Sequence, residues 1–262
     1  MGKAEEVLNI LLNDAPRLAG ANPQEGGPVF GTPGSGKSTF IHVFEKFAKK
    51  RGVLTLSIKM KDCNEAFAEI EIPGLEQKIS RRISSLLHFT ADDLKPSFDA
   101  LIISKCSNVD CFIEFVEKKY KSEIGMWIVA RFIVLKELIR GNKLILPTCL
   151  LEYDELYRRM IIGIIYVLRA FIPHVVLLDD ALAIVLNSLY GGIWPAMTRP
   201  YLASFNYYPN TEEILKFDPT IIAPRAEEDG VYKLATRDKY VIIYRGTKWE
   251  IPAREIYALS QS

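Results

Sequence analysis

The sequence predicts an α/β fold in which helices cover both faces of a mostly parallel sheet. Three features predict it. The glycine-rich segment GTPGSGKST at 31–39 lies between a short apolar run at 29–30 and apolar residues at helical spacing. The apolar run at 175–178 has the composition of a central parallel strand and ends at Asp179. Later short apolar runs, separated by turn residues, predict further strands and a C-terminal antiparallel hairpin.

Periodicity and turn residues place the elements in chain order. Strands are expected at 29–30, 53–60, 175–178, 201–205 and 220–223, with 175–178 adjacent to 29–30. Antiparallel strands are expected at 231–234 and 240–244, with a third at 249–251, so that the chain ends in strands. Helices are expected at 4–18, 40–47, 75–88, 91–103, 110–121, 124–140, 152–171 and 211–217.

The chain length and the spacing of the motifs predict the domain organisation. A length of 262 residues suits one large α/β domain. The segment between the second strand and the acidic strand is much longer than an ordinary connection. We therefore expect a single domain over 1–262 with a helical insertion over 63–150.

Composition excludes several classes of protein. The formal net charge is only +1, so a nucleic-acid surface would have to be local. The four cysteines form no C-x-x-C pair, which indicates reduced thiols and a cytoplasmic protein. The apolar stretch 160–178 is interrupted by Arg169, Pro173 and His174, and we expect no membrane span.

The glycine-rich segment fits the pattern G-x-x-x-x-G-K-[ST], which binds phosphate. Its backbone N–H groups turn toward a triphosphate, and the helix that follows directs its positive N-terminal end there. Lys37 would neutralise the β- and γ-phosphates, and Ser38 would bind Mg²⁺. The cofactors expected are therefore ATP and Mg²⁺. The binding residues expected are Gly31, Thr32, Pro33, Gly34, Ser35, Gly36, Lys37, Ser38 and Thr39.

The acidic strand supplies the second half of a nucleotide site. Asp179, at the carboxyl end of the strand, would hold Mg²⁺ through water, so that Ser38 and Asp179 are the expected metal residues. Asp180 stands where many ATPases carry a glutamate that orients the attacking water. It is alternatively the N-cap of a helix over 181–189. Together the two motifs predict a P-loop NTPase.

The order of parts after the acidic strand resembles the FtsK/HerA group of ring-forming ATPases, which includes conjugative coupling proteins and viral genome-packaging motors. The parts that carry the resemblance are Arg199, the strand 202–206, the helix 211–217, the strand that ends at Arg225, and the hairpin 240–246. The resemblance implies an ATP-hydrolysing motor that assembles as a ring and translocates or packages DNA. Asn206 and Asp180 depart from it, because the group carries glutamine and glutamate there.

The resemblance also implies roles for individual residues. Asn206 would contact the γ-phosphate or the attacking water, although it is alternatively a cap of the turn 206–210. Arg199 would act across a subunit interface, with Arg225 as the second choice, although Arg199 is alternatively a solvated loop residue. With Lys37, Asp179 and Asp180, these complete the expected catalytic set.

Other functions remain open at this point. Basic clusters at 46–51, 59–61 and 78–82 are candidates for a DNA surface, and each is alternatively a solvated face. The glycine-rich motif also suits an AAA+ initiator-like ATPase of DNA replication, which usually ends in a helical lid, or a small-molecule kinase. A non-catalytic, nucleotide-switched binding module is favoured if Asp180 cannot activate water.

Overall fold

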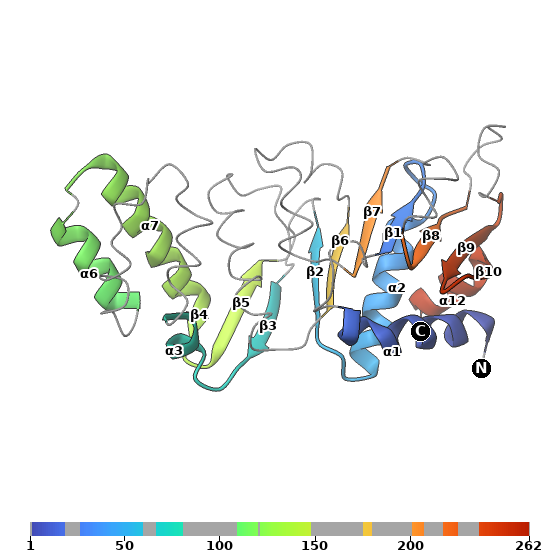
Figure 1. The fold of residues 1–262 in the computed structure, drawn as a ribbon, viewed down its shortest axis with the longest axis horizontal. Coiled ribbons are helices and arrows are strands. Elements are labelled where there is room, and N and C mark those ends of the chain that lie inside the picture. The colour runs from blue at the N-terminus through green and yellow to red at the C-terminus, as the bar shows by residue number, and fades with distance from the viewer. Residues whose placement is uncertain are drawn as a thin grey trace. The chain divides into compact units, whose positions relative to one another are not determined.

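The computed structural model describes residues 2–18, 27–59, 67–80, 109–119, 121–147, 175–179, 201–206, 217–224 and 236–261 (Figure 1). The chain divides into two compact units. One consists of Met1–Lys61 with Pro173–Ser262, and the other of Asp62–Ile172. The expectation of one domain with a helical insertion over 63–150 stays a prediction.

The first unit contains a seven-stranded mixed sheet in the order β10-β9-β8-β1-β7-β6-β2. Strand β1 is parallel to β7 and β8, and β6 is parallel to β2 and β7. Strands β9 and β10 continue the sheet antiparallel beyond β8. The mostly parallel sheet and the C-terminal hairpin are thus confirmed. The strand bounds are β1 Gly27–Phe30, β2 Thr55–Lys59, β6 Val175–Asp179, β7 Leu202–Phe205, β8 Thr220–Ile222, β9 Lys239–Tyr244 and β10 Thr247–Pro252.

The expected adjacency of the acidic strand and the loop strand is wrong, because β7 lies between β6 and β1. β7 pairs with β1 from Gly27↔Leu202 onward, and with β6 at Leu177↔Leu202. Apolar composition predicts that a strand is buried, but it does not specify which strands are neighbours. The interposed strand brings its own carboxyl end to the edge of the sheet where the glycine-rich loop lies.

Three helices of this unit pack on one face of the sheet: α1 Lys3–Leu18, α2 Lys37–Lys50 and α12 Ala253–Gln261 (Figure 1). Their apolar side chains share one core cluster with β1, β6 and β7. Phe44 of α2 and Tyr201, for example, have ring centroids 5.6 Å apart. On the described residues, helical cover is therefore confirmed for one face. The helices expected at 152–171 and 211–217 lie outside the described residues, apart from Phe217 in a bend.

The expectation that the chain ends in strands is wrong, because α12 follows β10. Ile256 is fully buried and Leu259 packs partly against the same core, which is helical i, i+3 spacing. A segment this short gives little periodic signal, and its helix is stabilised by packing rather than by propensity.

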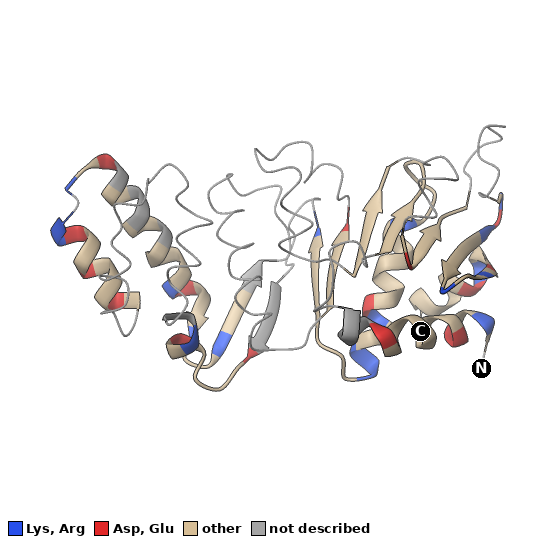
Figure 2. Ribbon diagram, viewed as in Figure 1, with Lys and Arg blue, Asp and Glu red and all other residues tan. Residues whose placement is uncertain are grey.

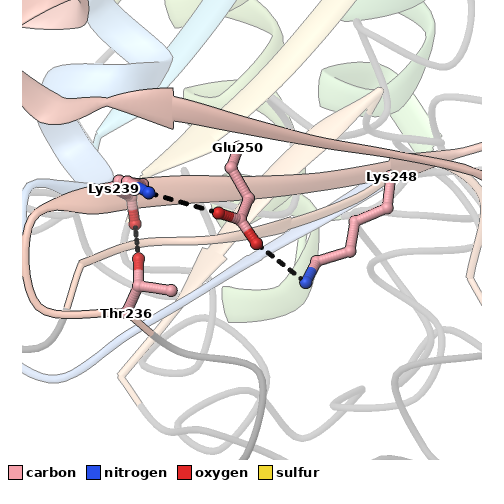
Figure 3. A network of polar contacts seen from close by, with 4 residues as sticks. All are labelled: Thr236, Lys239, Lys248 and Glu250. Carbon is pink, nitrogen blue, oxygen red and sulfur yellow. Dashed lines mark hydrogen bonds and ion pairs between the residues drawn. The ribbon is translucent and has the colours of Figure 1, made fainter.

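The C-terminal hairpin turns at Arg245 and Gly246, which have φ values of 50° and 73°. Two successive positive φ values match the right-handed twist of the paired strands, which explains the glycine at the second position. Glu250 contacts Lys248 Nζ of the same strand at 3.0 Å and, across the hairpin, Lys239 Nζ at 3.4 Å (Figure 3). Hydrogen bonds from Lys248 and Lys239 lower the pKa of the Glu250 carboxyl group. The strand expected at 231–234 lies outside the described residues.

The second unit contains a three-stranded antiparallel sheet in the order β3-β5-β4. Helices α6 and α7 pack together through Phe112 and Phe132, whose ring centroids are 4.5 Å apart. The segment was expected to be helical, and the pairing of 67–71 with 143–147 is a long-range contact that local periodicity does not reveal. The helix expected at 91–103 lies outside the described residues. The bounds are β3 Phe67–Glu71, α3 Leu75–Ser80, α6 Val109–Lys119, α7 Glu123–Leu138, β4 Ile139–Arg140 and β5 Lys143–Pro147.

On α6, Asp110 lies in the first turn and the basic residues Lys118 and Lys119 lie in the last turn, so that blue marks one end of the helix (Figure 2). On α2, basic residues gather in the last turn, where Lys49 and Lys50 face the negative end of the helix dipole. None of the helices in the described ranges has the length and hydropathy that crossing a bilayer would require.

A buried hydrogen bond connects α1 to the hairpin, and its removal should lower the stability of the protein. Tyr244 Oη donates to Asp14 Oδ2 at 2.7 Å, and the Arg245 guanidinium lies 3.3 Å from the same oxygen. We expect Tyr244→Phe to lower the free energy of unfolding by about 1–3 kcal/mol, because a buried carboxylate loses a donor. Urea denaturation measures this loss. Lys248→Ala, which removes an exposed ion pair, is the control and should leave stability unchanged. Equal stability of Tyr244→Phe and the unmutated protein would contradict the assigned contact.

Candidate functional site

A pocket of about 400 Å³ lies where the glycine-rich loop, the start of α2 and the carboxyl ends of β6 and β7 meet. The parallel strands direct their carboxyl ends to one edge of the sheet, which is the usual place for a ligand in such folds. α12 contributes to the pocket from the C-terminal part of the chain. The lining residues are Pro33, Gly34, Gly36, Lys37, Ser38, Thr39, Asp179, Ser204, Asn206 and Tyr257.

The beginning of α2 is suited to an anion. Gly36 is the N-cap, with φ 96°, a left-handed conformation that glycine adopts without strain. The first turn of α2 contains no acidic residue, so no side chain of the helix itself opposes the positive end of its dipole. Backbone N–H groups at a helix N-terminus and the dipole together favour a phosphate.

Lys37 follows at the first position of α2 and is only 6% exposed. Its Nζ donates to the carbonyl oxygen of Thr32 at 2.8 Å, so the side chain folds back over the loop. Lys37 also lines the pocket, so its positive charge would attract an anion bound there. The positive charge of the lysine and the positive end of the helix dipole both attract an anion into the pocket.

Asp179 joins the loop to the sheet. It ends β6, is 7% exposed, and its Oδ1 accepts hydrogen bonds from Ser38 Oγ at 2.9 Å and Ser204 Oγ at 2.8 Å. A carboxylate and a serine hydroxyl are hard oxygen ligands, the kind that Mg²⁺ takes together with waters and substrate phosphates. The donor set therefore fits a magnesium ion bound between Ser38 and Asp179.

Ser204 is a site residue that our sequence analysis did not select. It is fully buried in β7, two residues before Asn206, which lines the same pocket at the end of that strand. Side chains two apart in a strand point to the same face. Once Asn206 is chosen, this alternation is the signal that identifies Ser204.

The remaining expected site residues divide into two groups. Gly31, Thr32 and Ser35 belong to the loop without lining the pocket, and a Cβ at Gly31 would meet Ser35 Oγ. Asp180 and the two arginines, Arg199 and Arg225, lie outside the described residues. The structure thus brings together Lys37, Ser38, Asp179 and Asn206, along with Pro33, Gly34, Gly36 and Thr39.

Two tyrosines contact the loop from the C-terminal side. Tyr240 Oη donates to the Gly36 carbonyl oxygen at 2.8 Å, and the Tyr257 hydroxyl lies 3.0 Å from the position that a Cβ on Gly36 would take. Burial raises the pKa of Tyr240 well above its ordinary value, so this phenol stays protonated and remains a donor. More than 200 residues separate Gly36 from Tyr240, and no local pattern in the sequence could have indicated the contact.

Comparison with known proteins gives one finding at the level of structure. No family model and no curated protein sequence matches this chain. Among solved structures, the chain is similar to VirB4 of Thermoanaerobacter pseudethanolicus, with 10% sequence identity and a TM-score of 0.43. The match covers 88% of this chain and 92% of that one. At these values the similarity assigns neither fold nor function, and the geometry of the pocket carries the conclusions below.

The packing around Gly36 generates a prediction about the loop. A Cβ at Gly36 would meet the Tyr240 hydroxyl and lie 3.0 Å from Tyr257 Oη, and the left-handed backbone would cost about 1–2 kcal/mol besides. We therefore expect Gly36→Ala to weaken ATP binding by at least ~10-fold, measured by calorimetry. Gly52→Ala is the matched control, because Gly52 also has positive φ but no atom within 4 Å of its added Cβ. If both variants bind ATP as the unmutated protein does, the loop geometry described here is incorrect.

Proposed function

We propose that this protein binds ATP with Mg²⁺ in the pocket at the start of α2 and hydrolyses it. The observation that carries the proposal is the convergence of the Lys37 ammonium and the Ser38–Asp179 pair on one helix N-terminus. A cation, an oxygen ligand set for Mg²⁺ and a helix dipole form the combination that a triphosphate requires.

Each side chain has a distinct role in the proposal. Lys37 and the loop N–H groups neutralise the β- and γ-phosphates. Ser38 binds Mg²⁺ directly, and Asp179 holds it through water. Asn206, at the end of β7, contacts the γ-phosphate or the attacking water. The Ser204 hydroxyl donates to Asp179 and thereby orients the carboxylate.

Hydrolysis at this site is a transfer of the γ-phosphoryl group to water. The water oxygen bonds to the γ-phosphorus, and the bond from that phosphorus to the β–γ bridging oxygen breaks, so that ADP leaves with the electron pair. A proton of the water passes to the phosphate product. Asp180 follows Asp179 directly in the sequence and is the residue we propose to orient this water. Its side chain is one methylene shorter than glutamate, which favours binding without turnover as the alternative function.

The central prediction concerns the lysine. Lys37→Ala should reduce ATP turnover by at least ~100-fold, because the charge that stabilises the developing negative charge on the phosphates is removed. Lys118→Ala is the control, since Lys118 lies on α6 in an exposed ion pair with Glu114. Steady-state phosphate release measures both. Unchanged turnover in Lys37→Ala would refute the site. ATP binding with no turnover in the unmutated protein would identify a nucleotide-switched module instead.

The wider proposal is a DNA-translocating or DNA-packaging motor that works as a ring. It rests on the resemblance of the glycine-rich loop and of residues from about 172 to 253 to the FtsK/HerA group, together with the basic clusters of the sequence. In such a ring, Arg199 or Arg225 of one subunit would neutralise transition-state charge in the pocket of its neighbour. ATP turnover measured with and without double-stranded DNA tests whether DNA is the partner. The native mass of the protein tests whether it assembles into a ring.

Mixed assemblies test the arginine. Arg199→Ala and Lys37→Ala should each lose ATP turnover. The loss in Arg199→Ala should be on the order of 10³-fold. Mixing the two variants should restore part of the activity, because some interfaces join an intact lysine to an intact arginine. The measurement is phosphate release across a range of mixing ratios. The role of Arg199 across a subunit interface would be refuted if the protein were a fully active monomer. It would also be refuted if the mixture were no more active than the two variants measured separately.

A further inference from the structure

We propose that Tyr257 binds the nucleoside end of the nucleotide, with its ring packed against the aromatic base. This inference rests on the proposed function, since it assigns a second part of the same pocket. Tyr257 lies on α12, lines the pocket together with the glycine-rich loop, and is 41% exposed.

The position of Tyr257 around the start of α2 sets the direction of the ligand. Asp179 contacts Ser38, the second residue of α2, whereas the Tyr257 hydroxyl approaches Gly36, the residue before the helix begins. Asp179 and Tyr257 line the same pocket and meet the start of α2 at different residues. With the Mg²⁺-bound end of a triphosphate at Asp179, the nucleoside end is directed to Tyr257.

The tyrosine is also confined for this role. Its hydroxyl packs beside Gly36, 3.0 Å from the position of an added Cβ, and its backbone carbonyl accepts from Ser260 Oγ at 2.7 Å. The polar end of the phenol thus lies against the loop while much of the side chain stays exposed. An aromatic ring already held in position loses little conformational entropy when a base packs on it.

The remaining lining residues favour phosphate rather than a base. Apart from Tyr257 and Pro33, the described residues of the pocket are glycines, hydroxyl residues, Lys37, Asp179 and Asn206. Tyr257 is the only aromatic side chain among these described lining residues. Stacking on an aromatic ring tolerates different bases, because every base has a π-face.

The experiment compares a ligand that has a base with one that lacks it. Calorimetry with Mg²⁺ would measure the affinity of ATP and of inorganic tripolyphosphate for the unmutated protein and for Tyr257→Ala, Tyr257→Phe and Tyr240→Phe. We expect Tyr257→Ala to weaken ATP binding by on the order of 10-fold while tripolyphosphate binding is unchanged. Tyr257→Phe keeps the ring and should bind ATP nearly as well as the unmutated protein. Tyr240→Phe removes the bond to the Gly36 carbonyl and should weaken both ligands to the same degree.

The outcomes separate this inference from the proposed function. Equal loss of ATP and tripolyphosphate affinity in Tyr257→Ala would mean that the residue only positions the loop, and would overturn the proposal. Unchanged affinity for both ligands in that variant would overturn it as well. If the unmutated protein binds neither ligand, it is the nucleotide site itself that fails.

Discussion

A single carboxylate oxygen determines how the parts of this site are held together. Asp179 Oδ1 accepts from a hydroxyl on α2 and from another on β7. Because the carboxylate is nearly excluded from solvent, the two donors satisfy an atom that would otherwise be costly to bury. The arrangement fixes the first turn of α2 against the ends of two strands. It thereby links the start of α2, which follows the loop, to β6 and β7.

Much of the fold follows from local sequence patterns. The run 175–178 is apolar on both faces, and the helix 37–50 has apolar residues at 40, 41, 43, 44 and 48, all of them buried. The glycine-rich motif fixes the junction between β1 and α2, and hence the positions of Lys37 and Ser38. Such features depend on neighbouring residues, and periodicity reports them well.

The parts that the sequence did not predict depend on contacts between distant residues. The place of β7 between β1 and β6, the pairing of β3 with β5, and the approach of Tyr240 to Gly36 all join segments far apart in the chain. Ser204 lies between these two cases, because the alternation of side chains along a strand identifies it only after Asn206 has been chosen. Tyr257 has no local signal, because its role in the pocket depends entirely on where α12 packs. Helix α12, over 253–261, was missed for the same reason.

The hydrogen bond between Tyr240 and the carbonyl group of Gly36 has a consequence for the order of folding. It closes a loop of 204 residues, and contacts of such sequence separation are made late, after local helices and hairpins have formed. A chain emerging from the ribosome would thus form β1 and α2 long before the residues that brace them are available. The glycine-rich loop gains this hydrogen bond only when the C-terminal hairpin docks, so we expect a partly made chain to have an incomplete pocket.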